Sequence, residues 1–167
     1  MEIKIRRLGS SDNNDLFEIY NFPSLLENTS QLPFLNADIV ESLFNSPDNY
    51  TLVVESQSRV VGHITIFLKN KIREKHGASI AIAVHPDSHG KGIGKMLMLE
   101  AINQADNWLN LVRLELEVHV DNLAAISLYE QVGFEIEGTK KLSAFKSGKY
   151  LDVHMMSRIR PDYRAKG

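Results

Sequence analysis

Hydrophobic and polar residues alternate at the start of the chain, and a half-buried first strand is the element this pattern predicts. Ile3, Ile5 and, with a slip of one position, Leu8 are separated by charged residues, which matches the two-residue period of a strand. A helix is predicted next, with Leu16, Ile19 and Tyr20 as its apolar positions, and N-cap chemistry is available from Ser10, Ser11 and Asp12.

The next segment interrupts this regularity. Residues 22–35 hold two prolines among mixed polar residues and predict a loop or a broken helix. Asn36 or Asp38 is expected to cap a second helix whose apolar positions are Ile39, Val40, Leu43 and Phe44. The run Ser-Pro-Asp-Asn at 46–49 is expected to end it.

Strands dominate the middle of the chain. Residues 50–55 and 60–67 predict two strands joined by a turn at 57–59, which together form a hairpin. Residues 78–84 (Ala-Ser-Ile-Ala-Ile-Ala-Val) form a nearly continuous apolar run. Such a run is typical of a central strand that is covered on both faces.

The second half predicts two helices and three strands. The first helix carries one apolar side, made of Ile93, Leu97, Ala101, Ala105 and Trp108. Residues 112–120 alternate as a strand, and residues 122–132 predict a helix that Gly133 ends at a C′ position. Two final strands are expected at 139–145 and 151–159, with a turn at 146–149. The order β-α-α-β-β-β-α-β-α-β-β predicts one α/β domain, residues 1–167, with a mixed sheet.

Composition narrows the class of protein. The 167 residues carry a net charge of -2 and no cysteine, so we expect neither a nucleic-acid surface nor a disulfide or thiolate metal site. No apolar run is long enough to span a membrane, and no signal peptide is recognised. These features agree with a cytoplasmic protein. The small basic tail is expected to be solvated: Arg158, Arg160, Arg164 and Lys166.

A glycine-rich turn joins the apolar strand to the long helix. Gly90, Gly92 and Gly94 stand at every second position, where the lack of Cβ atoms lets an anion approach the backbone. The first amides of a helix have no intrahelical partner and lie at the positive end of its dipole. Lys91 and Lys95 add charge, so the turn predicts a diphosphate cradle. The Walker and Rossmann patterns both fail here, and a flexible turn without a ligand is the plain alternative.

Two motifs resemble those of the Gcn5-related N-acetyltransferase (GNAT) family. Residues 89–94 (His-Gly-Lys-Gly-Ile-Gly) are similar to its coenzyme A signature, [Gln/Arg]-x-x-Gly-x-[Gly/Ala], with His89 in place of Gln or Arg. Residues 116–134 look like its second motif, Leu-x-Val-x-x-x-Asn-x-x-Ala-Ile-x-Leu-Tyr-x-x-x-Gly-Phe, at every position. The resemblance implies a central mixed, mostly antiparallel sheet of six to seven strands flanked by about four helices. It also implies acetyl-CoA as co-substrate, no metal, and a homodimer.

The resemblance assigns site residues by position. Tyr129 would be the general acid, although a tyrosine that only packs in the core is the alternative, and Asn122 could also act as an N-cap. Glu117 is a candidate general base, but a solvated or salt-bridged glutamate without a catalytic role is an equal alternative. His119 and His63 are lesser candidates for the base. The residues expected to bind acetyl-CoA are Ile82, Ala83, Val84, His89, Gly90, Lys91, Gly92, Ile93, Gly94, Lys95, Asn122, Ala125 and Tyr129.

The resemblance also implies that the acceptor is a small-molecule amine. Residues 61–65, 106–109, 133–139 and 148–152 look like bacterial L-amino-acid N-acetyltransferases, which implies a free amino acid. Its carboxylate would need a cation or a helix N-terminus, and Arg73 and residues 24–31 are candidates by location. Protein N-terminal acetylation and polyamine acetylation stay open, the latter through Glu27, Asp38 and Glu41. A non-catalytic coenzyme A sensor is the alternative from another class.

Overall fold

The computed structural model describes residues 2–164, which divide into two compact units. Of the described residues, the first unit contains 2–67 and 81–101, and the second contains 68–80 and 102–164. The strands form a seven-stranded sheet in the order β1-β2-β3-β4-β5-β7-β6. Four helices of eight residues or more accompany it within these residues: α1, α3, α4 and α5. The predicted α/β architecture and element order are confirmed.

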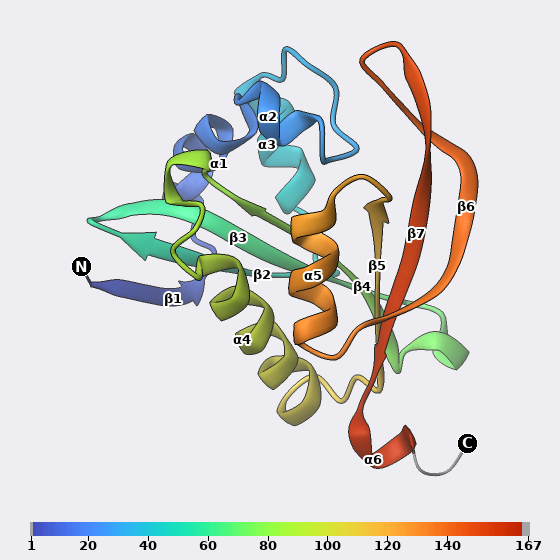
Figure 1. Ribbon diagram of the computed structural model, residues 1–167. Coiled ribbons are helices and arrows are strands. Elements are labelled where there is room, and N and C mark those ends of the chain that lie inside the picture. The colour runs from blue at the N-terminus through green and yellow to red at the C-terminus, as the bar shows by residue number, and fades with distance from the viewer. Residues whose placement is uncertain (1, 165–167) are drawn as a thin grey trace. The chain divides into compact units, whose positions relative to one another are not determined.

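An antiparallel sheet forms the base of the first unit (Figure 1). β1 (Ile3–Arg7) pairs with β2 (Asn49–Ser56), which forms a hairpin with β3 (Arg59–Leu68). Gln57 and Ser58 make the turn with φ of 52° and 62°. Positive φ at both central residues is the geometry that suits the twist of a two-residue hairpin.

Short helices follow β1 in the same unit. They are η1 (Ser10–Asp12), α1 (Asn13–Tyr20), α2 (Pro23–Leu26) and α3 (Ala37–Phe44). The side chain of Asn36 accepts a hydrogen bond from the amide of Ile39 (2.9 Å), so the predicted cap of α3 is confirmed. The apolar faces of α1 and α3 meet β2 and β3 in a core that includes Leu16, Ile19, Val40, Val53 and Val60.

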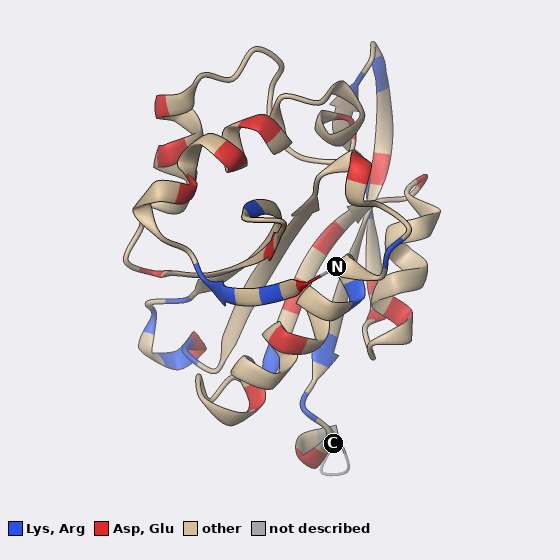
Figure 2. Ribbon diagram, turned by 90° about the vertical axis from the view of Figure 1, so that its left-hand side faces the viewer, with Lys and Arg blue, Asp and Glu red and all other residues tan. Residues whose placement is uncertain are grey.

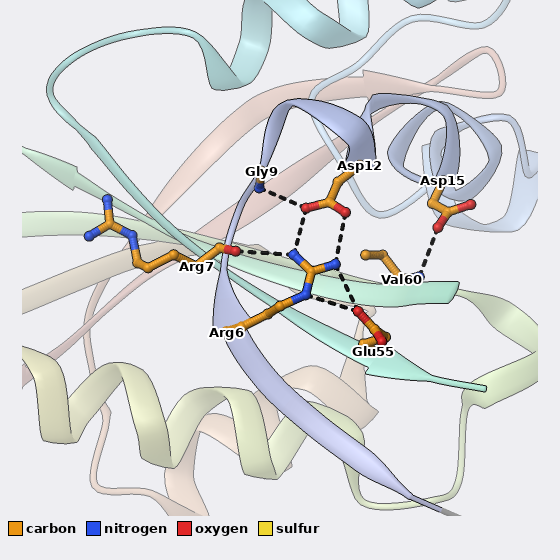
Figure 3. A network of polar contacts seen from close by, with 7 residues as sticks. All are labelled: Arg6, Arg7, Gly9, Asp12, Asp15, Glu55 and Val60. Atoms are coloured by element: carbon orange, nitrogen blue, oxygen red, sulfur yellow. Dashed lines mark hydrogen bonds and ion pairs between the residues drawn. The ribbon is translucent and has the colours of Figure 1, made fainter. Parts of the chain in front are cut away.

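Asp12 occupies the N-cap position of α1, as predicted, but its side chain does not cap that helix. Its carboxylate makes no cap bond to α1; instead it accepts from the backbone amide of Gly9 (2.7 Å) and from the guanidinium of Arg6 (2.8 and 2.9 Å). Arg6 also donates to Glu55 (2.9 Å), as Figure 3 shows. The hydrogen bonds from Arg6 hold the pKa of Asp12 below its usual range. The network therefore ties β1, η1 and β2 together.

Charge is unevenly distributed over the first unit. Figure 2 shows blue bands along β1 beside the N-terminus, and red bands on the short helices. Residues 8–58 contain no Lys or Arg, whereas acidic residues recur through them: Asp12, Asp15, Glu18, Glu27, Asp38, Glu41, Asp48 and Glu55.

β4 (Gly77–Val84) belongs to both units, since residues 77–80 lie in the second and 81–84 in the first. The prediction that it is covered on both faces is wrong for its second half, because Ala81 is exposed and Ile82 and Val84 are only partly buried. Ala81, Ile82 and Val84 therefore present surface to a ligand, which the apolar sequence alone does not reveal.

α4 (Ile93–Asn107) also contributes to both units. Ile93, Leu97, Ala101 and Ala105 are buried, as predicted. Trp108 is not: 76% of its surface is exposed, because the helix ends one residue before it. The predicted apolar side of the helix is therefore correct except for its last member.

The second unit is built on a long hairpin. β5 (Arg113–His119) runs parallel to β4 and antiparallel to β7 (Lys149–Ile159), which pairs with the edge strand β6 (Glu135–Lys146). α5 (Leu123–Gln131) connects β5 to β6 (Figure 1). The remaining elements are η2 (Ile72–Glu74) and α6 (Pro161–Arg164). β6 begins at Glu135, four residues before the strand that the sequence predicts at 139–145.

Arg158 corrects the prediction of a solvated tail. Two parallel hydrogen bonds of 2.9 Å join its guanidinium to Asp106, and only 11% of the Arg158 side chain is exposed. Arg160 donates to Asp162 (2.8 Å). Lys166 lies outside the described residues, as does the side chain of Arg164. Within residues 2–164, no helix is both long and apolar enough to span a membrane.

Candidate active site

The glycine turn of the first unit has the conformation that its sequence predicts. A single 3-10 turn, η3 (Pro86–Ser88), leads from β4 into residues 89–92. Gly90 and Gly92 have φ of 75° and 76°, values that L side chains rarely adopt. A Cβ atom built on either glycine would meet nothing within 4 Å. The backbone of the turn therefore borders open space.

The first amides of α4 have no partner within the helix. The amide of Met96 donates to the carbonyl of Gly92 (3.0 Å), so the amides of residues 93–95 come before the first intrahelical donor. Lys91 and Lys95 are exposed on the same segment. Free N–H groups, the positive end of a helix dipole and two cations together suit a diphosphate, so the cradle fits the nucleotide part of coenzyme A.

The side chain of His89 turns back toward the preceding strand. Its Nε2 lies 2.8 Å from the carbonyl oxygen of Val84, the last residue of β4. The amide of His85 in turn donates to the carbonyl of Val61 on β3 (2.7 Å). These two bonds fix the turn to the end of the sheet, and the sequence did not predict the His89 contact.

Asn122 and Tyr129 lie on α5 in the second unit. The Asn122 side chain accepts from the amide of Ala125 (3.4 Å), so its N-cap role is confirmed. Tyr129 is 8% exposed, and burial raises its pKa to about 12. Within residues 2–164 we find no hydrogen-bond partner for its hydroxyl. A buried tyrosine that keeps its proton suits a general acid.

Glu117 lies on β5 and forms an ion pair with Lys140 of β6. About half of each side chain is exposed (50% and 51%). The neighbouring Glu115 is more buried; burial opposes its charge, but Lys69 (2.9 Å) and Arg113 (2.9 Å) outweigh this effect and lower its pKa. Glu117 is thus the more accessible carboxylate of β5, and its ion pair with Lys140 agrees with the alternative interpretation of a salt-bridged glutamate.

The two histidines considered as bases differ in environment. His63 in the first unit is fully buried against Tyr20, whose hydroxyl lies 2.8 Å from Nε2, and burial lowers the pKa of His63 to about 3. It therefore stays neutral and is poorly suited to hold a proton. His119 in the second unit has a buried Nδ1 with no partner among the described residues.

The predicted site residues fall into two groups. Residues 82–84 and 89–95 lie together in the first unit, around the glycine turn, whereas Glu117, Asn122, Ala125 and Tyr129 lie in the second unit, on β5 and α5. Lys140 and the contact between His89 and Val84 are additions from the structure. No group of three or more metal-ligating side chains is found in the described part of the chain.

Comparison with known proteins identifies the family. The profile of the acetyltransferase (GNAT) family matches residues 13–134, which is most of the chain and includes both motifs. The chain belongs to the GNAT family. It is an acetyl-CoA-dependent N-acetyltransferase, and the fold expected from the sequence is the GNAT fold.

Individual GNAT relatives differ in their acceptors. The chain is 38% identical over 160 residues to the L-amino acid N-acetyltransferase AaaT of Escherichia coli K12, covering 95% of this chain and 99% of that protein. It also resembles a crystal structure of spermidine N-acetyltransferase from Vibrio cholerae in complex with CoA and spermine (TM-score 0.86, 27% identity, 96% and 97% coverage). A ribosomal-protein-alanine N-acetyltransferase from Brucella melitensis is similar as well (TM-score 0.83, 27% identity, 94% and 99% coverage).

Proposed function

We propose that this GNAT enzyme acetylates the primary amine of a free amino acid. The observation that carries the proposal is the likeness to an L-amino acid N-acetyltransferase along nearly the whole of both chains. The likeness includes the N-terminal helices and the last hairpin, where we expect the acceptor to bind, and not only the motifs. Arg73 on η2 and the segment around α2 stay candidates for the acceptor carboxylate.

Acetyl-CoA, when bound, supplies the acetyl group as a thioester. The amides and cations of residues 89–95 would hold its diphosphate, and the strand segment 82–84, in which Ile82 and Val84 are partly exposed, would hold its pantetheine arm. Asn122 and Ala125, at the start of α5, complete the proposed binding set.

Proton transfer falls to two side chains. In the reaction a C–N bond forms, the C–S bond breaks, and the amine loses a proton. Glu117 would accept this proton, directly or through water, and the Tyr129 hydroxyl would give one to the departing thiolate sulfur. The high pKa of Tyr129 means that its hydroxyl is protonated at neutral pH, as this role requires.

A thiol-release assay with acetyl-CoA tests the proposal. The acceptors should include panels of free amino acids, polyamines and peptides with free N-termini, and mass spectrometry should identify each product. We expect turnover with at least one free amino acid and an N-acetyl product. Thiol release with none of the free amino acids would refute the proposal, and coenzyme A binding without any turnover would favour the sensor alternative.

Polyamine acetylation is the second candidate, because a specific observation favours it. Residues 8–58 carry acidic side chains and no Lys or Arg, including the helices α1 to α3. An acidic surface attracts polycations. Charge reversal at Glu27 and Glu41 separates the candidates: kcat/KM for spermidine should fall if the polyamine is the acceptor, whereas a free amino acid should be much less affected. Protein N-terminal acetylation stays an alternative that the peptide panel tests.

Three further expectations are part of the proposal. Residues 1–167 would act as a single domain, which is supported by a family match that runs through both units. A homodimer is expected from the family and can be tested by sedimentation. A cytoplasmic location is supported by the lack of cysteine.

A further inference from the structure

The ion pair between Glu117 and Lys140 reaches across strand β7, which lies between β5 and β6 (Figure 1). In the strand register, Glu117 lies opposite Met155 and Lys140 lies opposite Val153. Residues directly opposite each other in antiparallel strands point to the same face of a sheet, and so do residues two apart on one strand. Both charges therefore share one face of the second unit, with the apolar Met155 and Val153 between them.

This pair is separate from the other charges of β5. Those charges already compensate one another in a chain of ion pairs of 2.6–2.9 Å: Lys69 with Glu115, and Arg113 with both Glu115 and Glu137. Within residues 2–164, neither Glu117 nor Lys140 has a second hydrogen-bond or ion-pair partner. Because half of each side chain is exposed, a ligand can reach both charges at once.

A free α-amino acid carries the complementary pair of charges. Its amine and its carboxylate are joined through a single carbon, so the nitrogen lies only about 2.7–3.6 Å from the carboxylate oxygens. The nitrogen and oxygen of an ion pair such as Glu117–Lys140 are separated by a similar distance, up to about 4 Å. An acceptor amine placed at Glu117 therefore brings its own carboxylate to Lys140.

We propose that Lys140 binds the α-carboxylate of the amino acid acceptor while Glu117 receives the amine. This inference rests on the proposed function, whose acceptor class it narrows to α-amino acids with a free carboxylate. The acceptor replaces one contact, between Glu117 and Lys140, with two contacts of its own, and the four charges alternate in sign around a ring. The exchange costs little, because a half-exposed ion pair is weak.

The same contact disfavours the other candidate acceptors. A polyamine has no carboxylate and brings further positive charges, which Lys140 repels. A peptide N-terminus carries an uncharged amide where the free amino acid has its carboxylate. Arg73 on η2 is a candidate for the carboxylate by location, but no contact between Arg73 and Glu117 is found in the described part of the chain.

Steady-state kinetics with matched acceptors test the contact. The two acceptors are the free amino acid that the enzyme turns over best and the carboxamide of the same amino acid, which has the same shape but no negative charge. The parent should prefer the free acid by roughly tenfold or more in kcat/KM, as expected for a hydrogen bond between charged groups. In Lys140→Met this ratio should fall by about tenfold, mainly through a higher KM for the free acid.

The ratio of the two acceptors isolates the carboxylate contact. The different basicity of the two amines, and any effect of the substitution on Glu117, influence both acceptors alike and cancel when variant and parent are compared. Lys140→Arg keeps the positive charge and should keep most of the preference. Lys141→Met, at the exposed next residue of β6, should keep the full parental ratio.

A parental ratio in Lys140→Met would overturn the inference, and so would a parent that acetylates the free acid and the carboxamide equally well. Loss of the preference in Arg73→Met but not in Lys140→Met would overturn it too, because the carboxylate would then bind at η2. A different result would refute the proposed function itself: no thiol release by the parent with any free amino acid, although it turns over spermidine or a peptide.

Discussion

Lys140 on β6 forms an ion pair with Glu117 on β5, so the carboxylate that we propose as general base already has a cationic partner. The ammonium group must give way, at least in part, before the carboxylate can approach an incoming amine. Both side chains are about half exposed, which limits the strength of the pair. The ion pair is therefore not expected to prevent Glu117 from acting as the proton acceptor.

The pH profile of kcat/KM tests this relationship. We expect Glu117→Gln to remove the acidic limb, because the variant has no carboxylate to accept the proton. Lys141→Met, at the exposed neighbouring lysine, is the control and should leave the limb in place. An acidic limb with the same midpoint in Glu117→Gln and in the parent would show that Glu117 is not the base.

Tyr129→Phe should lower kcat by about 100-fold and change the affinity for acetyl-CoA by less than about twofold, since only the proton donor is lost. Because the pKa of Tyr129 is about 12, the parent should show no alkaline loss of kcat from this group between pH ~7 and ~10. Tyr150→Phe, at an exposed tyrosine of β7, is the matched control. Equal kcat in Tyr129→Phe and parent would make Tyr129 a packing residue only.

Two substitutions at Gly92 separate backbone strain from ligand binding. Its φ of 76° is tolerated by Asn much better than by Val. We expect Gly92→Val to lower the free energy of unfolding by about 1–2 kcal/mol and Gly92→Asn by less than about 1 kcal/mol. Both should weaken acetyl-CoA binding roughly tenfold or more, because either Cβ enters the open space at the cradle.

The control for the glycine pair is Gly138→Ala on β6, where an added Cβ also meets nothing within 4 Å. Calorimetry measures the affinity for acetyl-CoA, and chemical denaturation measures the free energy of unfolding, in all variants. Parent-like affinity in Gly92→Asn would show that the turn does not contact the nucleotide.

Burial of His63 should make the protein sensitive to acid. Its pKa falls from about 6.5 in the unfolded chain to about 3 in the folded one. Below pH ~6.5 the unfolded state binds a proton that the folded state does not, so stability contributed by neutral His63 is lost as pH falls toward 3. The slope approaches about 1.4 kcal/mol per pH unit.

Chemical denaturation of His63→Gln at several pH values measures this slope. Its free energy of unfolding should be lower than that of the parent at pH ~7, where Tyr20 loses its imidazole partner, and should decline less steeply in acid. His76→Gln should keep the parental slope. An acid dependence identical in parent and His63→Gln would contradict the burial argument.

Local sequence signals predicted most of the fold and the conformation of the glycine turn. Gly133 ends α5 with φ of 101°, and Gly90 and Gly92 adopt positive φ, because backbone conformations of this kind strongly favour glycine. The Asn36 cap was predictable for a similar reason: its side chain bonds to an amide only three residues away.

Contacts between distant residues were not predictable from these signals. Arg158 lies 52 residues from Asp106, and Lys140 lies 23 residues from Glu117. Asp106 lies on α4 and Arg158 on β7, while Glu117 and Lys140 lie on two strands that β7 separates, so no local pattern in the sequence pairs these charges. Trp108 illustrates a related failure, since periodicity extends one residue beyond the end of α4 and cannot show where the helix stops.

The acceptor is the centre of this account, and a competition assay tests it most directly. Limiting acetyl-CoA is given to the enzyme with equal concentrations of free amino acids, spermidine and a peptide with an N-terminal alanine. Mass spectrometry of the products then reports the ratios of kcat/KM. We predict that N-acetylated amino acids form the main product, by at least about tenfold over the others. Predominant acetylation of spermidine or of the peptide would contradict the account.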